Sequence, residues 1–330
     1  MPRCRLLLLP IMILALLLPC LTPEYAPDTA SPAPPATTAT AAASTAASYW
    51  LPPLQIAPTP RVRLMTEGGT LELDAEEYLI GVVAAEMPAS FSAEALSAQA
   101  VAARSYLLSH SADYGRPRHT EADVCIESAH CQAYLSEAEL RQRWGAEYEA
   151  RYAKIAAAVA QTRGLVLWYA GAIAEAPFCS ACGGSSEAAA ELWGGTRDYL
   201  IAAECRWCAH APRYRQTEVL PLSEAAAALC CTESELLTMQ LVAESSGGRV
   251  ASLSIGGSSY SGAELRQRLK LPSAAFSWLI AGDELRIYCR GYGHGVGLCQ
   301  YGADGMAAEG AHFTAILAHY YPGTRLMQLY

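Results

Sequence analysis

The chain has 330 residues and a formal net charge of −9, from 23 lysine and arginine residues against 32 aspartate and glutamate residues. The sequence has no run rich in lysine or arginine, so it lacks the basic surface that is typical of nucleic-acid-binding proteins. The same charge balance makes an anionic membrane surface an unfavourable partner for the folded part.

In residues 1–22, two arginines, Arg3 and Arg5, precede an apolar stretch over residues 6–21. This arrangement is typical of a cleaved secretory signal or of an uncleaved membrane anchor. Two prolines interrupt the stretch, and it is slightly short for a membrane span. We favour an anchor because no clear cleavage site follows directly. In both cases the positive end stays in the cytoplasm and the rest is exported. We therefore expect an extracytoplasmic protein anchored to the cell membrane.

Residues 23–60 are rich in proline, alanine, threonine and serine, and they show no apolar periodicity. Such a composition predicts a disordered tether between the membrane and a folded region. The composition changes at Arg61, and about 270 residues remain from there to the end of the chain, which is ample for a hydrophobic core. We expect residues 61–330 to form one large folded region, with two small domains as the alternative.

The start of this region predicts a hairpin and two helices. Residues 61–74 alternate between apolar and polar side chains around a Gly-Gly turn. Asp74 is suited to cap a helix that Pro88 ends. A second helix is expected from Ser92; it is rich in alanine and can therefore pack closely against its neighbours.

Further along the chain, helical and strand patterns alternate irregularly. A polar loop is expected at 111–135. Helices are expected at 136–163, 223–230, 261–269 and 303–320, and strands near 165–173, 249–255 and 284–291. Because no regular βαβ order appears, the pattern predicts the α+β class, with mixed sheets and packed helices, rather than a doubly wound sheet.

Glu86 is a candidate acid because it ends the first apolar helix, immediately before Met87 and Pro88. A partly desolvated carboxyl group in this position would have a raised pKa, as a general acid requires. A solvated glutamate in a last helical turn is the commoner situation. The position alone therefore does not assign a role.

Two polar segments could contact a ligand. The first lies along the second helix, and the second contains five glycines, at 291, 293, 295, 297 and 302. Glycines at this spacing allow close approach of the backbone to a ligand, and polar side chains among them suit sugar hydroxyls; a glycine-rich turn without a ligand is the alternative. The candidate contact residues are Gln99, Arg104, Tyr106, Tyr292, His294 and Gln300.

Four potential metal ligands, His119, Cys125, His130 and Cys131, fall within 13 residues. Tetrahedral Zn²⁺ prefers ligands of these types. The alternative is a disulfide between the two cysteines. We favour a structural zinc because a histidine accompanies each cysteine, and four protein ligands would leave no open position.

Cys179, Cys182, Cys205 and Cys208 form a second set, with a C-x₂-C pair at each end of a 22-residue interval. This spacing resembles a zinc ribbon. A second zinc ion, two disulfides or free thiols all remain open for an exported protein.

Four sequence blocks in order resemble the stage II sporulation protein D/LytB family. They are EEYLIGVVAAEMPASFSAEALSAQAVAARSYLL, DVCIESAHCQAY, CSACGGSSEAAAELWGG and GYGHGVGLCQYGADGMA. The resemblance covers residues 61–330. Serine is usual in this family at Cys299 and within the 179–182 segment.

The resemblance implies a lytic transglycosylase that cleaves peptidoglycan glycan strands during engulfment of the forespore. Glu86 would protonate the glycosidic oxygen between N-acetylmuramic acid and N-acetylglucosamine. Its carboxylate would then accept the proton of the C6 hydroxyl, which closes onto C1 as a 1,6-anhydro end. Unlike ordinary glycoside hydrolysis, this reaction requires no second carboxylate.

The resemblance also implies partners and a metal. The expected partners are stage II sporulation protein P, an amidase that removes stem peptides first, and stage II sporulation protein M, a membrane scaffold. Some family members carry a metal at the positions that match His119, Cys125, His130 and Cys131.

Two other functions merit comparison. A LytB-like protein would bind glycan and modify an amidase without cutting; Glu86 argues for catalysis instead. A cysteine peptidase or amidase of the cell wall could use Cys299 with His294. The sequence gives Cys299 no evident helix N-terminus to lower its pKa, which disfavours that reading.

Overall fold

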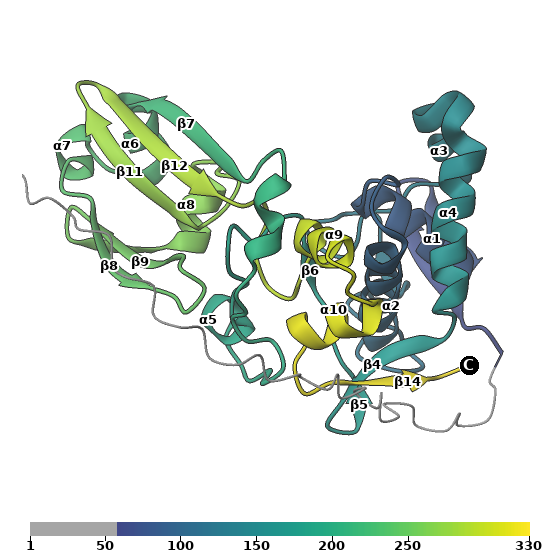
Figure 1. Ribbon diagram of the computed structural model, residues 1–330. Coiled ribbons are helices and arrows are strands. Elements are labelled where there is room, and N and C mark those ends of the chain that lie inside the picture. Colours follow the sequence, from purple (N-terminus) through teal and green to yellow (C-terminus); the bar gives the residue numbers. More distant parts are fainter. Residues whose placement is uncertain (1–57) are drawn as a thin grey trace, which may run out of the picture. The chain divides into compact units, whose positions relative to one another are not determined.

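The computed structural model describes residues 58–330 (Figure 1). The predicted anchor at 1–22 and the predicted tether up to residue 57 lie outside the described residues. Within residues 58–330, no helix combines the length and the apolar character needed to cross a membrane.

The described chain combines helices with five small sheets of two or three strands, which confirms the predicted α+β class. Its larger hydrophobic core is built mainly from helices (Figure 1). These helices are α1 (Ala75–Glu86), α2 (Ala93–Ser109), α3 (Glu137–Trp144), α4 (Tyr148–Gln161), α5 (Ala189–Trp193), α9 (Gln300–Ala308) and α10 (Phe313–Tyr320), with 3-10 turns η1 (Gly145–Glu147) and η2 (Arg206–His210).

Three sheets accompany these helices. One has the order β2-β1-β3, the second β14-β4-β5, and the third is the parallel pair β13-β6. The strands are β1 (Arg61–Thr66), β2 (Gly69–Asp74), β3 (Val124–Cys125), β4 (Leu165–Tyr169), β5 (Ala172–Ile173), β6 (Phe178–Cys179), β13 (Leu298–Cys299) and β14 (Arg325–Gln328).

A second hydrophobic core, which the sequence analysis did not separate from the first, lies within residues 215–290. Two three-stranded sheets, β10-β9-β8 and β11-β12-β7, pack there with three helices. The elements are β7 (Arg215–Pro221), α6 (Leu222–Leu229), α7 (Glu233–Leu236), β8 (Gln240–Glu244), β9 (Val250–Ile255), β10 (Ser258–Ser261), α8 (Gly262–Arg268), β11 (Phe276–Ala281) and β12 (Glu284–Arg290).

The predicted hairpin and first two helices are confirmed, and their ends follow the expected local signals. The Asp74 carboxylate accepts hydrogen bonds from the Glu76 and Glu77 backbone N–H groups at 2.8 and 3.4 Å, which caps α1. The predicted helix at 136–163 is instead divided into α3 and α4. Gly145 ends α3 with a positive φ of 52°, a conformation that favours glycine.

Helix α2 lies at the centre of the larger core, with 14 of its 17 residues buried. It contacts α1, α4, α9, α10 and β4, and Figure 1 shows α9 and α10 beside it. Small alanine side chains along α2 allow this many elements to approach one helix. Helix α2 is therefore enclosed by neighbouring elements.

Arg104 is fully buried on α2 and is paired with Glu76 on α1. Its guanidinium donates two hydrogen bonds to the Glu76 carboxylate, at 2.8 and 2.6 Å, and one to the Leu165 carbonyl at 3.1 Å. The Tyr330 hydroxyl donates a further one to Glu76 at 2.5 Å. This network joins α1, α2, β4 and the last residue of the chain.

Replacing Arg104 with methionine should leave the buried Glu76 carboxylate without its cation. Loss of one partner of a buried ion pair costs about 3–5 kcal/mol, so we expect a decrease of that size in the free energy of unfolding, measured by urea denaturation. The matched control is Arg61→Met, whose ion pair with Glu72 is exposed and should contribute only about 0–1 kcal/mol. Equal losses in the two variants would contradict this role for Arg104.

Candidate active site

Two cavities, of about 490 and 860 Å³, meet at the C-terminal end of α1. Glu86, Ser180 and Gln300 line both of them. The cavities therefore form the two arms of one cleft, with the Glu86 carboxylate at their junction. We call the smaller cavity the α3–α4 arm and the larger one the glycine-rich arm.

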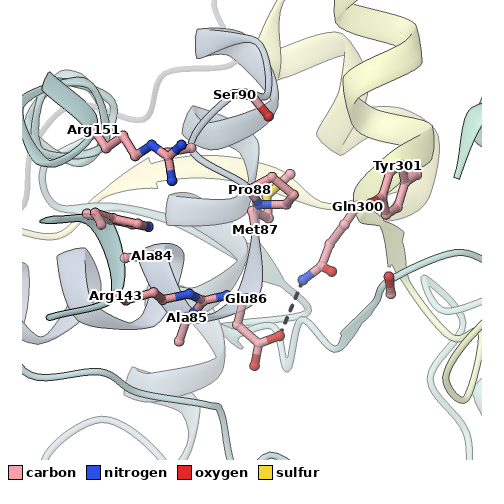
Figure 2. Close-up of a pocket in the computed structure, with 13 residues that line it drawn as sticks. Ala84, Ala85, Glu86, Met87, Pro88, Ser90, Arg143, Arg151, Gln300 and Tyr301 are labelled. Atoms are coloured by element: carbon pink, nitrogen blue, oxygen red, sulfur yellow. Dashed lines mark hydrogen bonds between the residues drawn. The ribbon is translucent and has the colours of Figure 1, made fainter. Parts of the chain in front are cut away.

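The Glu86 carboxylate is half-buried and accepts two hydrogen bonds. The Ala133 backbone N–H donates to Oε1 at 2.8 Å, and the Gln300 side-chain amide donates to Oε2 at 3.4 Å (Figure 2). Burial raises the pKa of Glu86, and these two hydrogen bonds offset only part of that rise. The carboxyl group is therefore disposed to carry a proton, as a general acid requires.

The position of Glu86 follows from the way α1 ends. The eight buried residues of α1 hold the helix in the core, and Met87, only 2% exposed, continues in extended conformation. Glu86 is thus the last helical residue and lies at the boundary between core and cleft. The partial negative charge at a helix C-terminus also disfavours a carboxylate there.

The α3–α4 arm contains residues that the sequence analysis did not single out. Arg143, Trp144 and Arg151 come from α3 and α4, and Tyr301 follows Gln300 on α9. Figure 2 shows the two arginines on one side of this arm, with Gln300 and Tyr301 on the other. Both arginines fall within the predicted helix at 136–163, where many side chains are charged. Only tertiary packing brings it to Glu86.

The glycine-rich arm brings together three of the predicted contact residues, Tyr106, Tyr292 and His294, and Gln300 lies at its junction with the other arm. The predicted metal ligands His130 and Cys131 also line it. Further charged or indole-bearing lining residues were missed by the sequence analysis, namely Arg118, Glu175, Trp193, Arg197 and Arg266.

Gln99 and Arg104 do not lie at the cleft, although we predicted substrate contacts for both. Each is 0% exposed on α2, and neither lines a cavity of the cleft. Because α2 is packed against several other elements, the side chains of Gln99 and Arg104 lie in the core, whereas Tyr106 near its C-terminal end reaches the cleft. The structure therefore gives Arg104 a framework role through Glu76 and places Gln99 in the interior.

His294 is held as a neutral donor. Its Nδ1 accepts a hydrogen bond from the Val296 backbone N–H at 3.0 Å, which leaves the proton of the neutral ring on Nε2. Burial, together with the cations of Arg266 and Arg249, lowers the pKa of His294 to about 4. The ring of Trp193 lies 5.2 Å from the His294 ring, centroid to centroid. Imidazole and indole together form a surface suited to a sugar.

Glu175 is the second carboxylate that lines the described cleft. Burial by itself would raise the pKa of Glu175, but His110, Arg197 and Arg118 together lower it to about 2. The two guanidinium groups each lie 3.0 Å from a Glu175 oxygen. Glu175 is thus ionised at neutral pH and paired with cations, whereas burial shifts the pKa of Glu86 in the opposite direction.

The first predicted metal set is brought together by the fold. One ligand atom from each of His119, Cys125, His130 and Cys131 lies within 4.8 Å of all the others. Three nitrogen–sulfur distances are 3.4, 3.5 and 3.5 Å. Tetrahedral zinc with Zn–N of about 2.0 Å and Zn–S of about 2.3 Å separates N and S by about 3.5 Å, so the set fits this ion.

The second predicted metal set is only partly brought together. Cys182, Cys205 and Cys208 have their sulfur atoms in one group, but the fourth member is Cys299 in place of Cys179. Cys299 also occupies the N-cap of α9, where its sulfur accepts from the Gly302 N–H at 3.3 Å. The expectation that no helix N-terminus lies at Cys299 is therefore wrong. Burial nevertheless raises the pKa of Cys299 well above its ordinary value, which opposes a nucleophilic role.

Comparison with known proteins gives consistent matches. A family model described as "Stage II sporulation protein" (SpoIID) matches residues 68–169, which contain Glu86 and the first predicted metal set. The chain is 37% identical over 254 residues to stage II sporulation protein D of Bacillus subtilis (strain 168), covering 77% of this chain and 74% of that protein. It is 36% identical to the protein of the same name from Bacillus amyloliquefaciens, with the same coverage.

The chain is also similar, at lower identity, to a protein that is not named as a sporulation protein. The amidase enhancer of Bacillus subtilis (strain 168) is 29% identical over 304 residues, which cover 75% of this chain and 40% of that protein.

The raised pKa of Glu86 predicts a pH-dependent effect of Glu86→Gln on stability. A carboxyl group whose pKa is higher in the folded state stabilises the fold below its unfolded pKa, and this contribution is lost as the pH rises through the folded pKa. Glutamine does not titrate. Urea denaturation between about pH 4 and pH 8 should therefore show the variant gaining stability relative to the wild type as the pH rises. A constant or decreasing difference would contradict the desolvation of Glu86.

Proposed function

The chain belongs to the stage II sporulation protein D family and has a role in sporulation; from this premise we propose that it is a lytic transglycosylase that cleaves peptidoglycan glycan strands. The observation that carries the proposal is the desolvated Glu86 carboxyl group at the junction of the two arms. A glycan strand lying along the cleft would have its scissile bond at this junction and sugars on both sides of it.

Glu86 performs both proton transfers in the proposed reaction. Its protonated form donates to the glycosidic oxygen between N-acetylmuramic acid and N-acetylglucosamine, and the bond from that oxygen to muramoyl C1 breaks. The resulting carboxylate accepts the proton of the muramoyl C6 hydroxyl as that oxygen bonds to C1. The products are a 1,6-anhydromuramoyl end and a free N-acetylglucosamine hydroxyl, and no water is consumed.

The electrostatics of Glu175 support a reaction with one acid/base. Glycosidases that use water or a covalent intermediate need a second carboxylate close to the scissile bond. Glu175 is engaged by Arg118 and Arg197 and has a pKa of about 2. It is therefore poorly suited to act as a base or a nucleophile.

Arg143 and Arg266 support a preference for peptide-free glycan. Each lines one arm of the cleft, and neither forms an ion pair within residues 58–330. Removal of a stem peptide leaves a free lactyl carboxylate on each muramoyl residue. Guanidinium groups bind carboxylates through strong, charge-assisted hydrogen bonds. The arginines would thus recognise a group that the intact, peptide-bearing strand lacks.

His119, Cys125, His130 and Cys131 would hold a structural Zn²⁺. Four protein ligands leave no open coordination position, so the ion would supply rigidity rather than catalysis. Ala133, whose N–H donates to Glu86 at 2.8 Å, follows the last ligand by two residues. The loop fixed at the metal set is thus the loop that orients the Glu86 carboxylate.

The proposed setting is the space outside the cytoplasm of the sporulating cell, with residues 1–22 as the membrane anchor. Stage II sporulation protein P would supply peptide-free glycan for this chain, and stage II sporulation protein M would act as a membrane scaffold during engulfment.

A second candidate function is that of a glycan-binding protein that modifies an amidase without cutting the glycan. The similarity to the amidase enhancer favours it. In this role the cleft would bind a strand in the same way, but no proton transfer from Glu86 would be needed. The two candidate functions therefore differ in the products formed from glycan.

Glu86→Gln should abolish cleavage, because glutamine can neither donate nor accept the required proton. Loss of a general acid/base lowers the rate by about 100-fold to 10,000-fold. Mass spectrometry of peptide-free glycan after digestion should show 1,6-anhydromuramoyl ends with the wild type. The Glu77→Gln variant is the control, because it carries the same substitution on the exposed face of α1, and it should form the same ends. The Glu86→Gln variant should not form them. Reducing ends would indicate a hydrolase, and no cleavage by the wild type would favour the amidase modifier.

Arg143→Gln and Arg266→Gln should each weaken the preference for peptide-free glycan. Loss of a hydrogen bond to a charged group costs about 1.5–3 kcal/mol, so cleavage of peptide-free glycan should slow by about 10-fold to 100-fold. Cleavage of intact strands should change much less. Arg268→Gln is the control on α8, since Arg268 is already paired with Glu264 at 2.8 Å. Equal effects of Arg266→Gln on both substrates would contradict carboxylate recognition.

A further inference from the structure

Four cysteines outside the first metal set come together from three separate segments of the chain. Cys182 follows β6, Cys205 is the N-cap of the η2 turn that contains Cys208, and Cys299 ends β13. Their sulfur atoms all lie within 4.8 Å of one another, and those of Cys182 and Cys208 are 3.7 Å apart. Four thiolates at about 2.3 Å around a tetrahedral zinc ion are separated by about 3.8 Å.

These cysteines are completely enclosed. Cys182 and Cys205 are 1% exposed, and Cys208 and Cys299 are 0% exposed. All four are free. Because the four thiols are adjacent and enclosed, they can all bind one ion, and solvent does not compete with them for it. A soft, thiophilic ion that prefers tetrahedral geometry is the ligand suited to such a set.

Neighbouring donors point at the sulfur atoms. The Cys182 and Gly302 backbone N–H groups donate to the Cys299 sulfur at 3.2 and 3.3 Å. The Tyr320 hydroxyl lies 3.1 Å from the Cys205 sulfur. Donors of this kind stabilise metal-bound thiolates in proteins. The N-terminus of α9 also favours negative charge at Cys299.

Two glycines on α9 permit its close approach to the η2 turn. A Cβ atom at Gly302 would lie 2.6 Å from the Cys205 sulfur, and one at Gly305 would lie 2.6 Å from the Trp207 carbonyl oxygen. Any larger residue would force α9 away from η2. The two glycines thus allow α9 and η2 to pack closely beside the four cysteine sulfurs.

The two C-x₂-C pairs behave differently for a physical reason. Cys205 is the N-cap of the 3-10 turn η2 and Cys208 lies three residues further on within it, so this one tight turn brings their side chains together. Cys179 instead ends an extended strand, β6, and lines the glycine-rich arm of the cleft. Its place is taken by Cys299 from β13, which pairs with β6 in parallel.

We propose that Cys182, Cys205, Cys208 and Cys299 bind a second, structural zinc ion. Its four ligands would fill the coordination sphere and join the β6 segment, η2 and α9 behind the cleft. Gln300, which donates to Glu86, is the residue after Cys299, and Ser180, which lines both arms, is two residues before Cys182. The ion would therefore fix the cleft wall opposite α1.

Metal analysis of the full-length chain tests this site directly. The chain and its variants are purified without chelators, and zinc and iron per chain are measured by inductively coupled plasma mass spectrometry. We expect two zinc ions in the wild type and in Cys179→Ser, and one in Cys299→Ser. Cys179→Ser is the matched control because it removes a buried thiol from the same region. Far-UV circular dichroism checks that each variant is folded.

The His119→Ala variant separates this site from the first metal set. It should retain one zinc ion whether or not Cys299→Ser folds. If the first set binds no zinc, the wild type and His119→Ala should both contain one ion, and the proposal made here would still stand. After cobalt substitution, His119→Ala should show strong thiolate-to-cobalt charge-transfer absorption, as expected for four sulfur ligands.

Three results would overturn the proposal. One is His119→Ala without metal. Another is loss of zinc from Cys179→Ser but not from Cys299→Ser, which would show that the fourth ligand is Cys179, as the sequence spacing suggested. The third is iron in place of zinc, which would exclude a zinc site at these four cysteines.

Discussion

The burial of α1 is the constraint on which the candidate active site depends. Helix α1 packs against α2 and α4, and the ion pair between Glu76 and Arg104 fixes its first turn in the core. Its last residue, Glu86, consequently lies at the cleft with its side chain half-buried. A carboxyl group so placed is partly desolvated, which raises its pKa. The acid that the proposed reaction needs is thus a result of packing as much as of residue type.

The two hydrogen-bond donors to Glu86 come from segments that carry the two groups of potential metal ligands. Ala133 follows Cys131, and Gln300 follows Cys299. One group lies beside the glycine-rich arm, and the other lies behind the cleft wall that carries Gln300. Zinc at both places, as we propose, would hold the carboxylate between two rigid supports. Short loops with little regular structure need such supports, because their own secondary structure does not fix them.

Local signals in the sequence predicted those features that depend on neighbouring residues. Caps and proline placed the ends of α1, and the ligands from His119 to Cys131 lie close enough in sequence to converge in one loop. Features that depend on long-range packing were not predictable in this way. Arg104 and Gln99 appeared to be contact residues, since nothing in the sequence reveals that α2 is enclosed on all sides. Cys299 joins the other three cysteines only because β13 pairs with β6, and Arg143 reaches Glu86 only through the packing of α3 and α4.

Digestion of peptide-free glycan in ¹⁸O-labelled water tests the central claim most directly. In the reaction assigned to Glu86, the attacking oxygen is the substrate's own C6 hydroxyl, so the account predicts muramoyl ends that contain no ¹⁸O. Mass spectrometry of the products measures this. One ¹⁸O atom at each new muramoyl end would mean that water attacks C1, and this would contradict an intramolecular reaction with Glu86 as the only acid and base.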